Sequence, residues 1–198
     1  MATGVELCNE ALLKLGAKFI TNFTDSPTGQ ICGMLLQSCV DLLSSGGVWT
    51  WAEKRATLTP AQTEVEPGVF EDTFGDVYQY VFTLPNDYIS MRKVMYNTTE
   101  VVDYYFPEIT EIEADPPEIE IIYNKRINVA ADVNVPLPVY IQDGFTSYLA
   151  HRLSPAVDDG ARSAEMLQDY AMKIMAAYKM DLRMRPTSIN KRNYHSGV

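Results

Sequence analysis

The spacing of apolar residues predicts two helices at the start of the chain. Thr3 and Glu6 form a capping-box pattern, and Gly16 stands where a left-handed C-terminal cap is expected. Ser26 followed by Pro27 predicts the start of a second helix, which Gly46 and its neighbouring glycine end. The expected apolar stripes are Leu7, Ala11, Leu12 and Leu15 in the first helix, and Ile31, Leu35, Ser38, Leu42 and Leu43, with Met34 and Cys39 beside them, in the second.

Helical spacing returns after residue 138. Ile141, Phe145 and Leu149 mark a third helix, which Pro155 is expected to break. Asp158 or Asp159 can cap a fourth helix, which Pro186 stops. The expected apolar face of the fourth helix comprises Ala161, Ala164, Leu167, Ala171, Ile174, Tyr178 and Leu182.

In the middle of the chain, apolar and polar residues alternate with the period of two that is typical of strands. Residues 49–58 suggest extended chain with alternate side chains inward. Further segments rich in Tyr, Val, Ile and Phe predict strands at 78–84, 89–96, 100–106 and 118–126. Residues 60–77 and 107–117 are expected to be loops, and the second of these is expected to be exposed and acidic.

These patterns predict an α+β fold. Residues 1–52 and 136–184 are expected to form an antiparallel helical bundle drawn from both ends of the chain. Residues 53–135 are expected to form an inserted antiparallel β module, and residues 185–198 an extended basic arm.

Composition narrows the class of protein. The chain has 198 residues, of which 46% are apolar and 21% charged, as in ordinary globular proteins. No apolar stretch approaches the roughly 20 residues of a membrane span, and the N-terminus does not resemble a signal peptide, so we expect assembly in a cytoplasm. Cys8, Cys32 and Cys39 are interpreted as small core residues.

Charge is unevenly distributed along the chain. The formal net charge is −10, yet residues 183–198 contribute four bases and no acid, so residues 1–182 carry −14. Residues 53–130 contain 15 acids and 6 bases. Such a body repels phosphate, and it suits a surface past which nucleic acid must slide.

The search for reactive chemistry finds no recognisable motif. The two histidines, His151 and His195, have no ligand partner nearby in sequence, and we expect no metal, no cofactor and no enzymatic activity. Because acids are plentiful, a glycan hydrolase that uses paired carboxylates stays open as an alternative.

Two other features are candidates for partner binding. One of Trp49 and Trp51 is expected to fill the junction between the second helix and the strands, and the other to contribute to a subunit interface. The basic arm is expected to dock on an acidic partner. Its candidate contact residues are Arg183, Arg185, Ile189, Lys191, Arg192 and Tyr194.

Five stretches together resemble the head-to-tail adaptors of bacteriophages, the tail tubular protein A kind. They are the run Ala11-Leu12-Leu13-Lys14-Leu15-Gly16, the run Phe23-Thr24-Asp25-Ser26, the run Asp41-Leu42-Leu43, the run Trp49-Thr50-Trp51-Ala52-Glu53-Lys54-Arg55-Ala56-Thr57-Leu58, and the turn Leu84-Pro85-Asn86-Asp87-Tyr88. A later helix around residues 149–155 is similar as well, so the likeness spans residues 8 to about 178. The chain departs from the family's pattern at Trp51, where Phe is frequent, and at Val40, where a basic residue is frequent.

The resemblance implies a structural ring subunit in the virion neck. The ring, commonly a dodecamer, would be clamped between the portal protein and the tail nozzle or tail tube, with DNA passing through unbound. A tail stopper or terminator is the alternative within the same class. Candidate acidic positions for the channel or its rim are Glu108, Glu111, Glu113, Asp115, Glu118 and Glu120.

Overall fold

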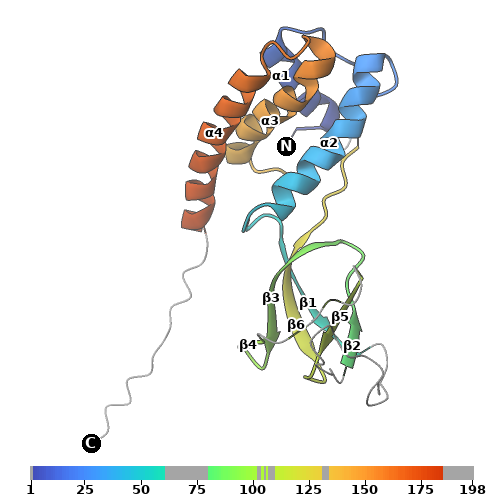
Figure 1. Cartoon of the computed structure of the whole chain (residues 1–198), viewed down its shortest axis with the longest axis vertical. Helices are drawn as coiled ribbons and strands as arrows, with labels where there is room; N and C mark the ends of the chain where they lie inside the picture. Colours follow the sequence, from blue (N-terminus) through green and yellow to red (C-terminus); the bar gives the residue numbers. More distant parts are fainter. Residues whose placement is uncertain are drawn as a thin grey trace, which may run out of the picture.

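The computed structural model shows an α+β fold with four helices and two antiparallel sheets, as the sequence predicts (Figure 1). It describes residues 2–60, 80–101, 104, 106, 110–130 and 134–184. The helices gather at one end of the molecule and the strands at the other. The strands lie between α2 and α3 in sequence, but in space they project from one end of the helical part.

The first two helices form as their capping residues dictate. Helix α1 spans Gly4–Leu15; the Thr3 hydroxyl accepts from the Glu6 amide, the Glu6 carboxylate accepts from the Thr3 amide, and Gly16 is left-handed with φ of 70°. Helix α2 spans Pro27–Ser45, and Ser26 Oγ accepts from the amide of Gly29 at 3.1 Å. Both expected helices are thus confirmed, with their caps.

The last two helices confirm the expected elements but correct one boundary. Helix α3 spans Val139–Val157 and continues through Pro155, which was expected to break it. Pro155 lies close to the end of the helix, where the loss of one backbone hydrogen bond matters least. Asp158 follows as the C-terminal cap of α3, and α4 spans Ser163–Met184.

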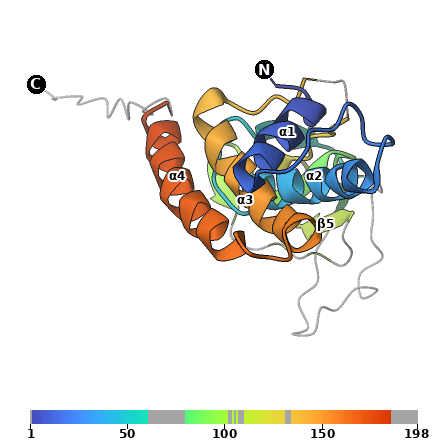
Figure 2. The ribbon, with the colours of Figure 1, turned by 90° about the horizontal axis from the view of Figure 1, so that it is seen from above.

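Helix α3 lies at the centre of the helical part. It packs against α1, α2 and α4, whereas α4 packs mainly on α3 (Figure 2). Burial on α3 therefore extends around most of its circumference, and Ile141, Phe145, Leu149 and Leu153 are fully buried. Cys8, Cys32 and Cys39 are buried in the same core, as predicted.

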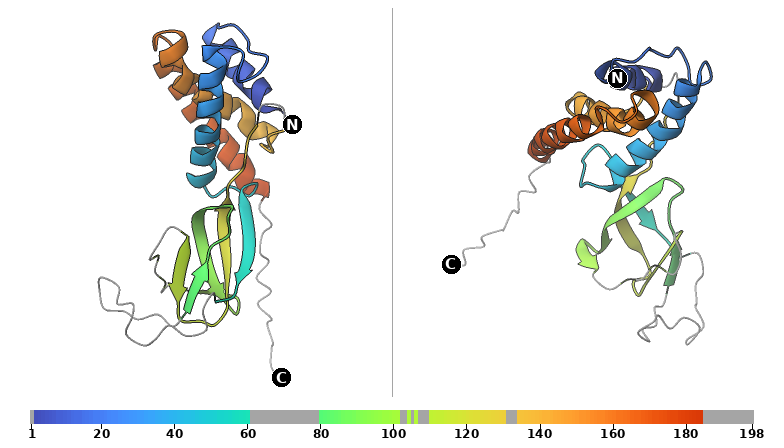
Figure 3. Two further views of the ribbon diagram at one scale, coloured as in Figure 1. Left: turned by 90° about the vertical axis from the view of Figure 1, so that its right-hand side faces the viewer. Right: turned by 45° about the horizontal axis from the view of Figure 1, so that its top comes forward.

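The strands form two sheets around a second core. Sheet order is β1-β6-β3-β4 in the larger and β2-β5 in the smaller, and every pairing is antiparallel (Figure 3). The side chains between the sheets include Phe82, Val94, Ile112, Ile121 and Tyr123. The strands are β1 Glu53–Leu58, β2 Tyr80–Thr83, β3 Tyr88–Tyr96, β4 Thr99–Val101, β5 Glu111–Ala114 and β6 Ile119–Lys125.

Strand β5 corrects the expectation of an exposed acidic loop at 107–117. Glu111–Ala114 pairs with β2, with Ile112 opposite Phe82. The alternation of acidic and apolar residues resembles a loop in composition, but Ile112 and Ala114 are buried in the second core. Burial of these apolar residues and pairing with β2 therefore outweigh the low strand propensity of glutamate here.

The two parts of the molecule are joined by adjacent chain segments. Strand β1 leaves α2 and strand β6 returns toward α3, and the two strands pair from Glu53 opposite Asn124. The Lys125 amide extends the pairing by donating to Ala52 O at 2.8 Å. Arg126 donates to Asp41 on α2 at 2.9 Å, which ties the returning segment to the helical part.

Candidate assembly surface

The apolar stripes expected on α2 and α4 are only in part the faces that these helices bury. On α2 the buried side chains include Cys32, Leu36, Cys39 and Val40, whereas Ser38 and Leu42 are exposed. The shift recurs on α4, where the expected Ala164, Leu167, Ala171 and Leu182 are all exposed. The expected stripes are therefore correct only in part. Their members Cys39 and Leu43 are buried, and Ile31, Leu35, Ile174 and Tyr178 pack against the core, whereas the remaining members face outward.

Helix α4 is held by a polar anchor as well as by apolar contacts. Its fully buried residues are Met166, Ala177 and Asp181. The Asp181 carboxylate accepts from Thr50 N at 3.1 Å, from Thr50 Oγ1 at 2.6 Å and from Tyr140 Oη at 2.8 Å. Burial and the hydrogen bond to Asp181 raise the pKa of Tyr140 to about 12. This buried carboxylate joins the C-terminal turns of α4 to the α2–β1 connection and to the start of α3.

A charge network anchors the middle of α4. The Lys173 ammonium lies 2.7 Å from Asp169 and 2.9 Å from Asp143 on α3, and Lys14 of α1 lies 2.7 Å from Asp143. Burial alone would raise the pKa of Asp143, but hydrogen bonds from Lys14 and Lys173 lower it. Polar contacts thus fix the orientation of α4 on α3, so the outward face is a defined surface.

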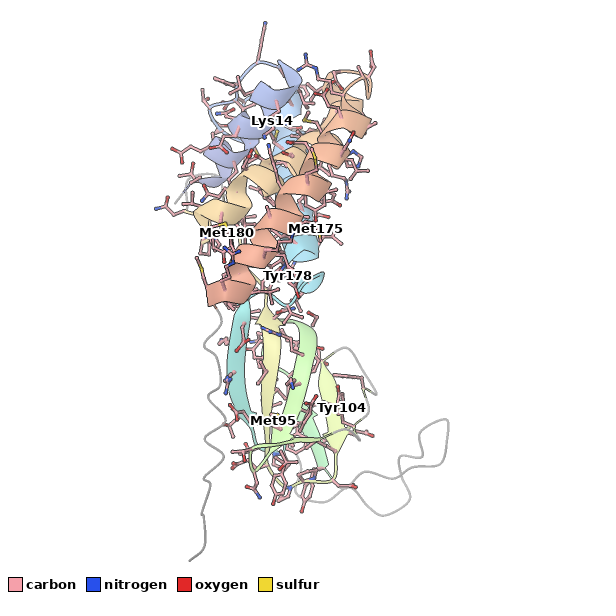
Figure 4. All side chains as sticks on the ribbon, turned by 90° about the vertical axis from the view of Figure 1, so that its left-hand side faces the viewer. Lys14, Met95, Tyr104, Met175, Tyr178 and Met180 are labelled. Carbon is pink, nitrogen blue, oxygen red and sulfur yellow. The ribbon has the colours of Figure 1, made fainter. Side chains whose placement is uncertain are left out.

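The outward face of α4 is rich in methionine. Met172 is 62% exposed and Met175 is 59% exposed, and Leu182 lies on the same side. Figure 4 looks onto α4 from outside, with Met175 and Met180 on different flanks of the helix. The exposed side of α4 thus carries methionines together with charged residues such as Glu165 and Lys179, and methionine packs readily against varied surfaces. Five of the nine methionines of the chain lie between residues 166 and 184, and this clustering is the signal in the sequence for this surface.

An apolar groove separates α4 from the C-terminal end of α2. Its volume is about 350 Å³, and its walls include Leu42 and Val48 on one side and Ile174, Met175 and Tyr178 on the other. Leu42 and Val48 are among the exposed large apolar side chains. The groove therefore extends the apolar surface from α4 toward α2.

A second groove lies on the outer side of α2. Its volume is about 590 Å³, and it runs between α2 and the start of β3. Met34, which is 77% exposed, and Leu42 line it together with Ile89. Leu42 lines both grooves, so the C-terminal half of α2 forms a ridge between them.

The two tryptophans occupy different environments at the junction. Trp49 is buried, donates from Nε1 to Leu43 O at 2.9 Å and packs edge-on against Tyr178 at 5.7 Å. Trp51 is half-buried against the helical core, and its buried Nε1 has no hydrogen-bond partner among the described residues. Trp49 is thus the ring that fills the junction.

This difference predicts opposite responses to phenylalanine. Trp49→Phe removes a buried hydrogen bond and is expected to lower the free energy of unfolding by about 1–3 kcal/mol. Trp51→Phe removes an unpartnered donor and is expected to change it by less than about 1 kcal/mol. Urea unfolding followed by circular dichroism measures both. Equal losses for the two variants would contradict this assignment.

The candidate acidic positions fall into three groups. Asp115 and Glu118 are exposed, and Glu111 and Glu120 are half-buried; Arg55 lies 3.7 Å from Glu120. Glu113 is only 4% exposed, so it is not available as a rim residue. It lies in β5 opposite Val81 of β2. Glu108 lies outside the described residues.

Among the candidate contact residues of the basic arm, only Arg183 lies in the part of the chain that the structure describes. Arg183 is exposed in the last turn of α4. The others, namely Arg185, Ile189, Lys191, Arg192 and Tyr194, lie outside the described residues.

A polar pocket of about 610 Å³ lies beneath the end of α2. Arg92 in its wall donates to Glu53 at 2.5 Å, and Arg55 and Lys93 also have carboxylate neighbours, so its charges largely cancel. Within the described ranges, no group of three or more His, Cys, Asp and Glu side chains is arranged to hold a metal ion. Across those ranges, none of the helices is both long and apolar enough to cross a membrane.

The candidate assembly surface therefore combines the apolar side of α4 and the apolar groove beside it with a second groove on α2, most of whose lining residues are polar. The polar anchors at Asp181 and Lys173 position α4 within it. Comparison with known proteins identifies no family model that matches the chain and no curated protein that matches its sequence.

Proposed function

We propose that this chain is a structural subunit of a bacteriophage neck, a homo-oligomeric ring that joins the portal to the tail. The observation that carries the proposal is the outward apolar face of α4, with Met172, Met175 and Leu182 exposed in the single chain. Contiguous exposed apolar surface is typical of a protein–protein interface. The sequence resemblance to head-to-tail adaptors supplies the identity of the assembly.

The proposed subunit has three parts. An antiparallel bundle from residues 1–52 and 136–184 forms the ring wall, and the β insert at 53–135 extends from it. The arm at 185–198 reaches the portal or a neighbouring subunit. This architecture agrees with the separation of helices and strands in Figure 1.

Charge supports a passage that does not retain DNA. Residues 1–182 have a formal charge of −14, and Asp115 and Glu118 are exposed on the β module. Negative surface repels phosphate, so DNA that moves through the ring is not held. The channel would thus be a conduit without sequence recognition.

The mass of the native protein tests the proposal. We expect the purified chain, alone or mixed with its portal, to form a ring whose mass is a multiple of 22.3 kDa and which occupies the neck in a virion reconstruction. Multi-angle light scattering and electron microscopy measure these properties. Duplex DNA should show no measurable binding at moderate salt.

The alternatives give different results in the same experiments. A position at the distal end of the tail tube would indicate a stopper or terminator. Polysaccharide or peptidoglycan cleavage by the pure protein, lost on substitution of one acidic residue with the fold intact, would replace the proposal with a glycan hydrolase.

A further inference from the structure

The helices and the strands enclose two separate hydrophobic cores, and a band of polar residues lies between them. Along β1 the chain leaves the first core at Ala52 and reaches the second at Ala56. Along β6 it leaves the second core at Tyr123 and returns to the first at Ile127. The residues between, which belong to neither core, are Glu53, Lys54, Arg55, Asn124, Lys125 and Arg126. We call these six residues the polar waist, and Figure 3 shows the helices and the strands as two bodies joined at this level.

The contacts that bridge the waist are polar. Asn124 and Arg92 donate to backbone oxygens of the α2–β1 connection, at 3.1 Å and 3.4 Å. Arg126 lies 2.9 Å from Asp41 of α2, and the side chains of this pair are 51% and 22% exposed. Ion pairs near the surface contribute little to stability. A polar interface of this kind, without a shared core, is typical of parts of a chain that move relative to each other.

Space for such a movement adjoins the waist. The polar pocket of about 610 Å³ lies between the α2–β1 connection and strands β1, β3 and β6. The second groove, of about 590 Å³, lies between α2 and the module residues Ile89 and Arg126. The two share only Ser45, and both open to the surface. The module can therefore incline toward α2 without displacing packed side chains.

The structure on either side of the waist is firmly held. On the helical side, Trp49 donates to Leu43 O at 2.9 Å and the Thr50 hydroxyl donates to Asp181 at 2.6 Å. On the side of the module, the Tyr123 hydroxyl donates to Asp87 at 2.8 Å, and the two sheets pack around a common core. Bending is therefore expected to concentrate at the waist.

We propose that the β module turns as a rigid body about the polar waist, and that the ion pair between Arg126 and Asp41 limits the turn. Strands β1 and β6 stay paired and bend together, since they form the connection between the two parts. The inference goes beyond the proposed function, because it concerns the single chain. In a ring of such subunits, the projecting modules would change their inclination while the helical wall stays closed.

Spin labels on the full-length protein measure the movement. The native cysteines are buried, so Leu13→Cys on α1 and Thr99→Cys on β4 provide exposed labelling sites on the two parts. Thr57→Cys with Thr99→Cys gives a reference pair within the module, and Leu13→Cys with Met172→Cys gives one within the helical part. We expect double electron–electron resonance to give a distance distribution across the waist about twice as wide as either reference distribution.

Removal of the ion pair tests what limits the turn. Arg126→Gln is expected to widen the distribution across the waist by about half again, because an exposed ion pair restrains the module only modestly. Lys93→Gln is the matched control, since it removes an equally exposed cation that pairs with Glu100 inside the module, and it should leave the width unchanged. Sodium chloride at about 1 M screens exposed pairs and should act like Arg126→Gln.

Three outcomes would overturn the inference. A distribution across the waist no wider than the references, both with Arg126 and with Arg126→Gln, would show that the two parts form one rigid body. A reference distribution within the module as wide as that across the waist would show that the module itself deforms. Equal widening by Arg126→Gln and Lys93→Gln would remove the role given to the ion pair with Asp41. Unchanged reference distances establish that each variant is folded, and the neck function is tested separately by particle mass and position in the virion.

Discussion

Asp181→Ala is expected to lower the free energy of unfolding by about 3 kcal/mol. The substitution removes the acceptor for the Thr50 amide, the Thr50 hydroxyl and the Tyr140 hydroxyl. These donors lie at a part-buried junction, where water replaces the lost carboxylate only in part. Urea unfolding followed by circular dichroism measures the change.

Two further variants separate the hydrogen bonds from the helix itself. Glu165→Ala removes an exposed acid from the same helix and is expected to change stability by less than about 1 kcal/mol. Asp181→Asn keeps one carbonyl oxygen in place and should fall between the two. A loss on Asp181→Ala no larger than that of Glu165→Ala would show that the junction does not depend on this carboxylate.

Phe145→Ala is expected to lower the free energy of unfolding by about 4 kcal/mol. Phe145 is fully buried on α3, the helix against which the other three pack. Its removal leaves a cavity that cannot collapse easily, because neighbours from several helices would have to move together. Thermal and urea unfolding, followed by tryptophan fluorescence, measure the loss.

Phe19→Ala is the matched control. Phe19 is 62% exposed in the segment after α1, so its truncation is expected to cost less than about 1 kcal/mol. Similar losses for Phe19→Ala and Phe145→Ala would mean that α3 is not the centre of the core.

The elements with local signals were predictable from the sequence. Thr3, Gly16 and Ser26 make capping interactions within a few residues of themselves, so the ends of α1 and α2 follow from short-range chemistry. Strand β3 followed from its β-branched and aromatic residues and from the turn before it.

The faces that the helices bury were not predictable from periodicity alone. Helices α2 and α4 each have apolar residues on two sides, so spacing identifies two candidate stripes and does not rank them. Which of the two stripes is buried depends on where α3 lies, because both helices pack against α3. Strand β5 was missed for a related reason, because its partner β2 is distant in sequence.

The hydrogen bonds of Asp181 that hold α4 in place were also not predictable from the sequence. Nothing in the sequence near Asp181 distinguishes it from the other charged residues of α4. Its partners Thr50 and Tyr140 are 131 and 41 residues away along the chain. Only tertiary structure brings the three together. Of the candidate aromatics, the sequence identified the junction at Trp49 but not the hydrogen bond that orients it.

The pairing of β1 with β6 brings together the two points at which the chain enters and leaves the β module. The chain enters and leaves the module through two neighbouring strands, with Lys125 N only 2.8 Å from Ala52 O. Changes in the length of the module's distal connections therefore do not alter the spacing between α2 and α3. We expect the part of the module that projects farthest to tolerate changes of length while the helical part stays the same.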